Sequence, residues 1–287
     1  MLSGMRRPPH LLILGLGYSA TAVALRAVAA GYRVTGTRRG DAPPPPGIRL
    51  VRPEAAAALL GEATHWLVGA PPNAEGDSIL LLLGAAMRAH RPDWIGYFST
   101  TGVYGDRKGG WVDESTPPAP TGPRGIRRVE AEQAWAELAA TLGSRLDILR
   151  LAGIYGPGRS VFEALRAGQS RRIVAPGHCF GRIHRDDIAG ATLAAMGSGT
   201  GSRILNLVDD LPAESAVVIE EAARLLGLPP PPAIPLDEAL PGMSPMGRSF
   251  WAENRKVASR LTKEALGRQW LHPTYREGLA AILAEEG

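Results

Sequence analysis

The sequence predicts an α/β fold with a doubly wound parallel sheet, and two patterns support this prediction. Short apolar segments, typical of buried strands, alternate along the first half of the chain with segments whose apolar residues recur at helical spacing. The first strand, at residues 11–14, runs directly into a turn of glycines and then into a helical pattern. Such an alternation of strands and helices is typical of a parallel sheet covered by helices on both faces.

The turn of glycines, in the segment LLILGLGYSA, matches the pattern G-x-G-x-x-G/A of dinucleotide-binding proteins. Gly15 makes the tight turn, Gly17 lets a pyrophosphate approach the backbone, and Ala20 allows the helix to pack closely on the strand. Tyr18 and Ser19 lie at the start of that helix, where free N–H groups and the helix dipole would hold the diphosphate. We therefore expect a Rossmann-type nucleotide-binding sheet, the alternative being an ordinary strand–turn–helix that uses glycine for its turn.

The end of the second strand, expected at residues 32–36, indicates which dinucleotide binds. NAD-binding proteins carry an acidic residue here that holds the adenosine ribose hydroxyls. This chain has Thr37, followed by Arg38 and Arg39. Because a guanidinium forms paired hydrogen bonds with a phosphate, we expect NADP rather than NAD. The other interpretation of the two arginines is a solvated turn.

The remaining elements of the sheet follow in order. Residues 69–72 form a loop of small residues after a strand, and its Ala70 and Pro71 would lie beside the cofactor. Residues 77–90 combine an N-terminal acid with apolar residues at helical spacing, which predicts a helix. Further strands are expected at 48–51, 64–68, 94–98 and 146–151, and a short helix at 54–61.

The character of the chain changes after residue 159, so we expect one domain at 1–159 and a smaller lobe at 160–287 with segments that return to the sheet. Asp186 and Asp187 open one of its helices, which they would cap. Residues 106–125 and 236–249 show no regular pattern, and the second of these looks mobile. Helices are expected at 161–167, 188–196, 216–226, 254–266 and 275–283, and a strand and turn at 170–180.

Composition narrows the classes of protein to which the chain can belong. A single cysteine, Cys179, excludes an internal disulfide framework. The net charge of +4 comes from basic residues scattered without interleaved aromatics, so we expect no nucleic-acid partner. The longest apolar run, 79–87, is too short to cross a membrane, and the first ten residues show no signal-peptide pattern. We therefore expect a cytoplasmic protein with no membrane partner, and we find no metal-ligand cluster in the sequence.

Five segments, occurring in the same order along the chain, resemble those of one family. Residues 98–105, FSTTGVYG, are similar to its SS-x-x-VYG segment. The other four are RLAGIYGPGR at 150–159, RIHRDDIA at 182–189, NLVDDLP at 206–212 and GIRRVEAEQ at 125–133. The chain is thereby identified as an atypical member of the extended short-chain dehydrogenases/reductases, the NAD(P)-dependent epimerase/dehydratase family.

The resemblance implies hydride transfer between a nicotinamide and a small-molecule substrate. Thr100 corresponds to the family's catalytic Ser/Thr, whose hydroxyl bonds a substrate carbonyl or alcohol; the alternative is a threonine that satisfies a strand end. Ser99 would lie on the cofactor side and Thr101 on the substrate side. The residues after 159 would form a substrate lobe, in which Arg182 would lie near the pocket.

The chain departs from the family at the catalytic helix, which usually carries Tyr-x-x-x-Lys. Arg124 stands at the tyrosine position and Arg128 at the lysine position. Because arginine is always protonated, Arg124 is no general base and would contact the substrate instead. Arg128 can still bind the nicotinamide ribose and supply a positive field.

Three side chains are candidates to replace the missing acid/base. Tyr104 and Tyr155 each lie just past the end of an expected strand, and His184 lies in the HRDD segment. The family's tyrosines at these positions look mainly structural, and a hydrogen-bonded structural histidine is the alternative for His184.

Two functions are therefore compatible with the sequence. The first is an NADP(H)-dependent oxidoreductase or epimerase/dehydratase-like enzyme that acts on a small hydroxylated or carbonyl substrate and forms a homodimer. The second is a nonenzymatic NADP(H)-binding redox sensor or scaffold, which the loss of the Tyr-Lys pair favours and the retention of Thr100 disfavours.

Overall fold

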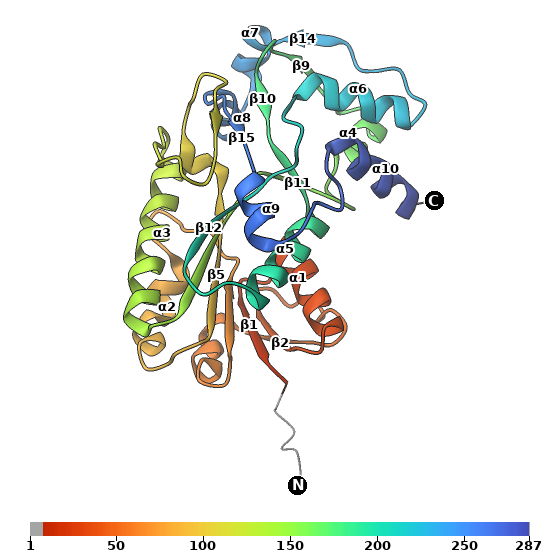
Figure 1. Ribbon diagram of the computed structural model, residues 1–287. Helices are drawn as coiled ribbons and strands as arrows, with labels where there is room; N and C mark the ends of the chain where they lie inside the picture. Colours follow the sequence, from red (N-terminus) through yellow and green to blue (C-terminus); the bar gives the residue numbers. More distant parts are fainter. Residues whose placement is uncertain (1–7, 287) are drawn as a thin grey trace. The chain divides into compact units, whose positions relative to one another are not determined.

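The computed structural model describes residues 8–286 and confirms the doubly wound parallel sheet. Seven strands lie in the order β12-β7-β5-β4-β1-β2-β3 (Figure 1). The chain builds β2 and β3 on one side of β1 and then returns to place β4 on its other side, so the strand order reverses at β1. The strands are β1 (His10–Leu14), β2 (Arg33–Thr37), β3 (Ile48–Val51), β4 (His65–Val68), β5 (Trp94–Thr100), β7 (Arg145–Leu151) and β12 (Arg203–Leu207).

The described chain divides into two compact units that interleave along the sequence. Unit 1 comprises the residues up to Ser99, Arg127–Leu149 and Ile188–Ile204, and unit 2 comprises Thr100–Ile126, Arg150–Asp187 and the residues from Leu205 onward. This division differs from a single boundary at residue 159. The chain passes between the units several times, and three of these passages fall inside strands of the sheet.

Unit 1 surrounds an apolar core between the sheet and its helices. Helices α2 and α3 lie on one side of the strands and α1 on the other (Figure 1). The indoles of Trp66 and Trp135 are fully buried there, together with leucines from α2 and α3. The helices are α1 (Tyr18–Ala29), α2 (Ser78–Met87), α3 (Pro123–Leu142) and α5 (Arg185–Gly197), with a 3₁₀ helix at Pro53–Leu59 where the sequence predicted a short helix.

Asp77 ties two helices of this unit together. One carboxylate oxygen accepts hydrogen bonds from the backbone N–H groups of Ile79 (3.0 Å) and Leu80 (3.1 Å), which caps α2 as the sequence predicted. The other oxygen accepts from the indole Nε1 of Trp135 on α3 (3.0 Å). The same buried side chain therefore satisfies a helix end and an aromatic donor of the core.

Replacing Asp77 by alanine should lower the free energy of unfolding by about 1–2 kcal/mol, because both bonded helices lose their acceptor. Differential scanning calorimetry measures this as a lower Tm. The matched control is Asp41→Ala, since Asp41 is exposed and pairs only with the exposed Arg52. Equal Tm values for the two variants would show that Asp77 does not anchor α2.

Unit 2 is built from short strands and helices around a core of its own. Tyr155, Phe162, Val218, Tyr275 and Leu279 are among the buried residues of that core. The strands are β6 (Trp111–Val112), β8 (Gly153–Tyr155), β9 (Arg172–Val174), β10 (Cys179–Phe180), β11 (Arg182–His184), β13 (Ala213–Glu214), β14 (Ala233–Pro235) and β15 (Lys256–Val257). The helices are α4 (Val161–Arg166), α6 (Ser215–Leu225), α7 (Leu236–Ala239), α8 (Pro245–Trp251), α9 (Arg260–Leu266) and α10 (Tyr275–Glu286), with 3₁₀ helices at Thr101–Tyr104 and Leu240–Gly242.

Three expectations for unit 2 were wrong in detail. The segment expected to look mobile contains α7 and α8, and Ser244 caps α8 by accepting from Gly247 N. The helix expected at 254–266 begins only at Arg260, because the preceding residues form β15. That strand pairs with β6 inside the segment for which no regular structure was expected.

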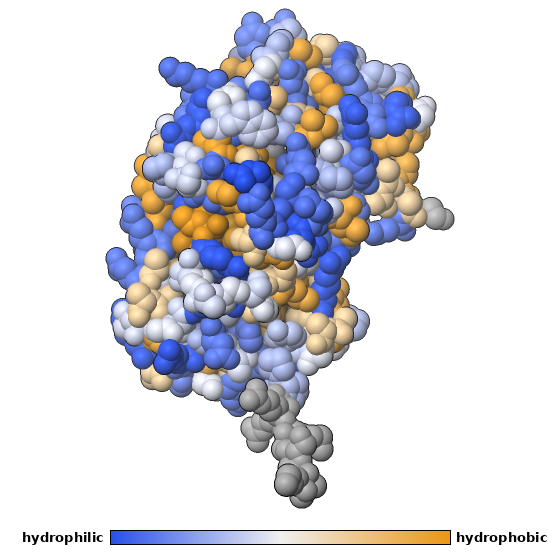
Figure 2. Space-filling view, viewed as in Figure 1, coloured by the Kyte–Doolittle hydropathy of each residue, from blue (hydrophilic) through white to orange (hydrophobic). Residues whose placement is uncertain are grey.

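The described residues contain no helix that is long and apolar enough to cross a membrane. Figure 2 shows hydrophilic and hydrophobic side chains interspersed over the face that it draws.

Candidate functional site

The glycine turn of unit 1 is closed tightly against the loop that follows β4. Gly15 has a φ of +99°, and a Cβ added there would lie 2.6 Å from the backbone nitrogen of Ala70. Gly15 N donates to the Thr37 hydroxyl (2.8 Å) at the end of β2. On the other side, a Cβ on Gly69 would lie 2.5 Å from the Gly15 carbonyl oxygen. Only glycine fits at positions 15 and 69, so the turn brings the ends of three strands together.

Gly17 is different, because it faces open space. It is the N-cap of α1, and a Cβ added there would meet no atom within 4 Å. The buried Ser19 and Ala20 follow in the first turn, with Tyr18 at the helix start. The first N–H groups of a helix have no partner within the helix and form an anion site with its dipole. The loop therefore has the shape and the donors that a dinucleotide pyrophosphate requires.

The two arginines after β2 differ in their surroundings. Arg38 donates from Nε and Nη2 to the carbonyl oxygen of Leu16 (3.3 and 3.0 Å), so its guanidinium is clamped on the glycine turn. Arg39 is exposed, and no hydrogen bond ties its side chain to the described part of the chain. Of the two cations predicted to meet a 2′-phosphate, Arg39 is the one that remains available.

Arg128 on α3 is held by the end of β5. Its Nη1 donates to the Tyr97 hydroxyl (3.0 Å) and to the carbonyl oxygen of Phe98 (2.8 Å). Next along β5, the Ser99 hydroxyl donates to the Glu132 carboxylate one turn further along α3. Burial raises the pKa of Tyr97, so its phenol stays neutral. Sequence reasoning missed Tyr97 and Glu132, because only the packing of α3 on β5 gives them these partners.

Arg124, which belongs to unit 2, is exposed at the start of α3. Its guanidinium lies 5.6 Å from the centroid of the Phe250 ring on α8, in a cation–π contact. The guanidinium lies at the surface, and the Phe250 ring that it contacts is neither an acid nor a base.

Thr100 opens unit 2, directly after Ser99. Its hydroxyl oxygen accepts from Gly102 N (3.1 Å) and caps the 3₁₀ helix, while the side chain stays half-buried. The accepted bond fixes the oxygen and leaves the hydroxyl hydrogen available to a ligand. Thr101, by contrast, is buried.

Tyr104 is fully buried between protein groups. Its hydroxyl donates to Asn206 Oδ1 (2.8 Å), and the Arg150 guanidinium lies 4.8 Å from the centroid of its ring. Burial raises the pKa of the phenol. These contacts link the 3₁₀ helix after β5 to β7 and β12 through residues of the family motifs.

Tyr155 and His184 come together because β8 and β11 pair in parallel, with these two residues in register. Their ring centroids are 5.2 Å apart. The Tyr155 phenol lies under α10, where a Cβ on Gly278 would come within 1.9 Å of its oxygen. Burial, followed by nearby carboxylates, raises the pKa of Tyr155. His184 has no exposed surface, and its Nδ1 accepts from Asp186 N (3.2 Å).

Asp187 does not cap α5 as the sequence predicted. Its carboxylate instead accepts from Leu271 N (2.6 Å) and His272 N (2.9 Å), which anchors a distant loop. This arrangement brings His272 against His184, with ring centroids 4.2 Å apart. The ligating atoms of His184, Asp186 and His272 lie within 4.8 Å of one another, a grouping that the sequence did not reveal.

The buried Asp209 and the half-buried Arg182 interact in unit 2. Asp209 N donates to the Arg182 carbonyl oxygen (2.6 Å), while Arg182 Nη1 donates to the carbonyls of Phe180 and Ala213. Burial raises the pKa of Asp209 to about 8, even though the Arg182 charge acts in the opposite direction. The Arg182 guanidinium is thus used in hydrogen bonds to the backbone of unit 2. Asp209 was not singled out from the sequence, because its motif indicated only a turn.

Comparison with known proteins assigns the family. Residues 78–224 match the model of the "NAD dependent epimerase/dehydratase family". The chain belongs to this family. It is 32% identical over 245 residues to Protein YeeZ of Escherichia coli (strain K12), covering 76% of this chain and 84% of YeeZ. It is also 31% identical over 176 residues to the 3-diazoavenalumate denitrifying reductase of a Streptomyces species, covering 59% of this chain and 55% of the reductase.

A solved structure shares the fold of this chain. A functionally unknown conserved protein from Silicibacter pomeroyi DSS superposes with a TM-score of 0.89 at 40% identity, covering 96% of this chain and 99% of that chain. The description of the family names NAD as its cofactor, and one of the relatives reported above is a reductase.

Proposed function

We propose that the protein is an NADP(H)-dependent oxidoreductase that acts on a small carbonyl or hydroxyl substrate. The observation that carries this proposal is the glycine turn of unit 1, which holds Gly15 at a φ of +99° against Ala70 and leaves open space over Gly17 at the start of α1. The reductase among its relatives supports redox chemistry.

The residues of unit 1 would hold the cofactor at three places. The turn and the first residues of α1 would bind the pyrophosphate, Ala70 and Pro71 would line its path, and Arg39 would meet the 2′-phosphate. When bound, the nicotinamide donates or accepts a hydride at C4. Ser99 and Arg128, fixed by Glu132 and Tyr97, would face the nicotinamide ribose.

Thr100 would donate its hydroxyl to the substrate oxygen on which negative charge develops. The family's tyrosine position holds Arg124, which is always charged and cannot give up a proton. Tyr104 and Tyr155 are enclosed by protein, and their pKa values are raised. We therefore assign the proton to a water molecule that Thr100 positions, and give the buried tyrosines and His184 structural roles.

Arg39→Ala should weaken NADPH binding by about tenfold or more, because a charge-assisted phosphate contact contributes roughly 1.5–3 kcal/mol. NADH binding should stay unchanged, since NADH lacks the 2′-phosphate. Isothermal titration calorimetry of both cofactors measures this. Arg49→Ala is the control, because Arg49 is an exposed arginine of β3. Equal affinity of the unmodified protein for NADH and NADPH would exclude the assigned preference.

Arg38→Ala should behave differently, because Arg38 clamps the glycine turn through Leu16. Its loss should weaken both cofactors alike. An effect confined to NADPH would instead place Arg38 on the 2′-phosphate.

A screen of aldehydes, ketones and sugar nucleotides, followed by NADPH absorbance, tests the reaction itself. Tight NADPH binding without hydride transfer to any member of the panel would favour the alternative, a nonenzymatic redox sensor or scaffold. The exposed Arg124 in place of the catalytic tyrosine is the observation that keeps this alternative open.

A further inference from the structure

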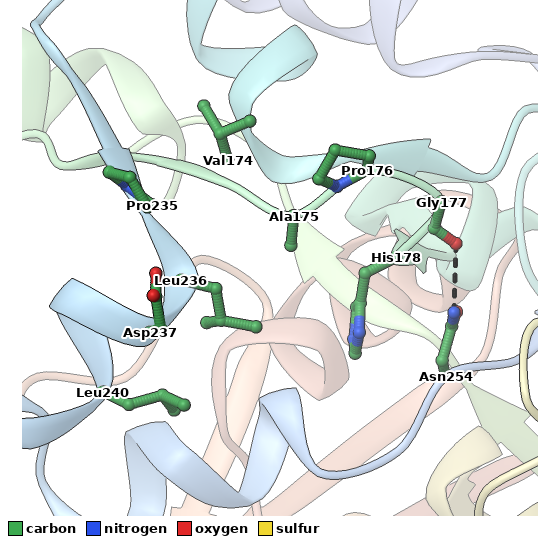
Figure 3. Close-up of a pocket in the computed structure, with 10 residues that line it drawn as sticks. All are labelled: Val174, Ala175, Pro176, Gly177, His178, Pro235, Leu236, Asp237, Leu240 and Asn254. Carbon is green, nitrogen blue, oxygen red and sulfur yellow. Dashed lines mark hydrogen bonds between the residues drawn. The ribbon is translucent and has the colours of Figure 1, made fainter.

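Unit 2 contains a cavity of about 580 Å³, and its described lining includes none of the motif residues discussed above. One wall is the turn between β9 and β10, including Ala175 and His178, and the other is the start of α7, including Leu236 and Asp237. Figure 3 shows Ala175 and His178 facing Leu236 and Asp237 across this space. The volume lies in the range that encloses a small organic ligand.

The position of the two walls is set by main-chain pairing. β9 and β14 run in parallel, and their register puts Pro235 beside Val174 at the rim of the cavity. Asn254 fastens the turn, because its Nδ2 donates to the Gly177 carbonyl (3.0 Å) and its Oδ1 accepts from Cys179 N (3.2 Å). The amide is used by the fold on both sides, so it holds the cavity open rather than binding its contents.

The described residues that line the cavity are mainly apolar and include no arginine or lysine. Val174, Ala175, Leu236 and Leu240 provide aliphatic surface, and Asp237 is the only carboxylate. Arg172, the basic residue of β9, is directed elsewhere, because it donates to the Pro231 carbonyl (2.7 Å) and pairs with Glu220.

His178 adds a flat, neutral surface. Its ring centroid lies 4.9 Å from that of Phe180 and 5.2 Å from that of Trp251, so it belongs to an aromatic cluster. Burial lowers the pKa of His178 despite nearby Asp106, which leaves the imidazole uncharged at neutral pH. A rigid aromatic edge packs well against another flat ring.

We infer that this cavity binds an uncharged, ring-bearing group of the substrate in preference to phosphate and carboxylate groups. The inference rests on the proposed function, because it names the substrate class of that reaction as apolar ring-bearing aldehydes and ketones. An anion would meet Asp237 with no arginine, lysine or protonated histidine in the lining to compensate it. A neutral ring with a hydroxyl or amino substituent would bury its ring against the aliphatic wall and donate to Asp237.

The test is ligand-observed NMR titration of the full chain with 4-phenylbutan-2-one, a neutral aryl ketone, and with UDP-glucose. The ketone should bind, and Leu236→Asp should weaken it about tenfold, since a half-buried leucine of the wall becomes a charge. Leu228→Asp is the matched control at an exposed leucine outside the lining, and it should change nothing. Circular dichroism of each variant reports that the fold is kept.

Removal of the Asp237 charge gives a second, independent test of the preference for uncharged ligands. Phenylpyruvate, an aryl keto acid, should bind worse than the ketone, and Asp237→Asn should improve it by about two- to fivefold, because Asp237 is exposed and its repulsion is screened. The same substitution should not improve binding of the neutral ketone. If Asp237 had a structural role, Asp237→Asn would change the affinities for both ligands in the same direction.

Failure of the ketone to bind, an unchanged affinity in Leu236→Asp, or UDP-glucose displacing the ketone would overturn the inference. Binding is measured without cofactor, so it does not depend on catalysis. Ketone binding without any oxidation of NADPH would refute the proposed reaction and leave the cavity assignment standing. NADPH oxidation by the ketone with a KM that Leu236→Asp leaves unchanged would support the proposed reaction and overturn the cavity assignment.

Discussion

Gly17→Val should weaken NADPH binding by at least about 100-fold while the protein stays folded. A valine side chain would fill the space over the N-terminus of α1, where the pyrophosphate has to approach the backbone. The diphosphate would then lose several charge-assisted bonds to N–H groups, each of which contributes roughly 1.5–3 kcal/mol. No protein atom lies within 4 Å of the added Cβ, and the backbone φ of −92° suits any residue, so the substitution strains nothing in the fold.

Calorimetric titration with NADPH measures the effect of the substitution on cofactor binding, and a thermal melt without NADPH measures its effect on the stability of the fold. Gly84→Val is the control, because Gly84 also belongs to unit 1 and its Cβ would also meet open space. Gly15→Ala should give the opposite result, since its Cβ would come 2.6 Å from Ala70 N at a positive φ and destabilise the turn itself. Normal NADPH affinity in Gly17→Val would place the diphosphate elsewhere.

The sequence predicted the sheet well because its signals are local. A buried strand shows as an apolar run, and the glycine turn shows as a spacing of a few residues, so β1, the turn and α1 could be placed from neighbouring letters alone. The same holds for Asp77, whose capping of α2 depends on the residues that directly follow it.

The features that could not be predicted depend on residues far apart in the chain. β15 exists because Lys256 and Val257 pair with β6, and neither two-residue strand has a pattern of its own. Asp187 looked like a helix cap, and only the folded chain shows its carboxylate bound to the loop at His272. Side-chain burial likewise determines the pKa of Asp209, and no local pattern reports it.

The candidate site likewise combines features that the sequence predicted with features that only the folded chain shows. The motifs identified which residues matter, but they did not distinguish the clamped Arg38 from the exposed Arg39. They also placed Tyr104 and Tyr155 among possible proton donors, whereas the structure gives both phenols enclosed surroundings. A motif reports a position in the chain, while acid/base chemistry requires access to the substrate.

Thr100→Ala should lower kcat/KM by about 10²–10³-fold with NADPH affinity unchanged, once a carbonyl substrate has been found. This is the typical cost of removing one hydrogen-bond donor from a developing oxyanion. The Thr100 oxygen accepts from Gly102 N, a bond that does not use the hydroxyl hydrogen, and the proposed function has this hydrogen donated to the substrate oxygen. Thr100→Ser keeps the hydroxyl and should retain most of the activity.

Two further variants decide between water and a buried side chain as the proton source. Tyr104→Phe and Tyr155→Phe remove only a phenolic oxygen, and we expect each to keep kcat within about threefold of the unmodified protein, since neither would act as the general acid. A loss of 100-fold or more in one of them, with NADPH binding intact, would identify that phenol as the donor and reject water. Full activity in Thr100→Ala would be more damaging to the proposed function, because Thr101, the next hydroxyl along the chain, is buried. The reacting oxygen would then have to lie away from the site that the family motifs mark.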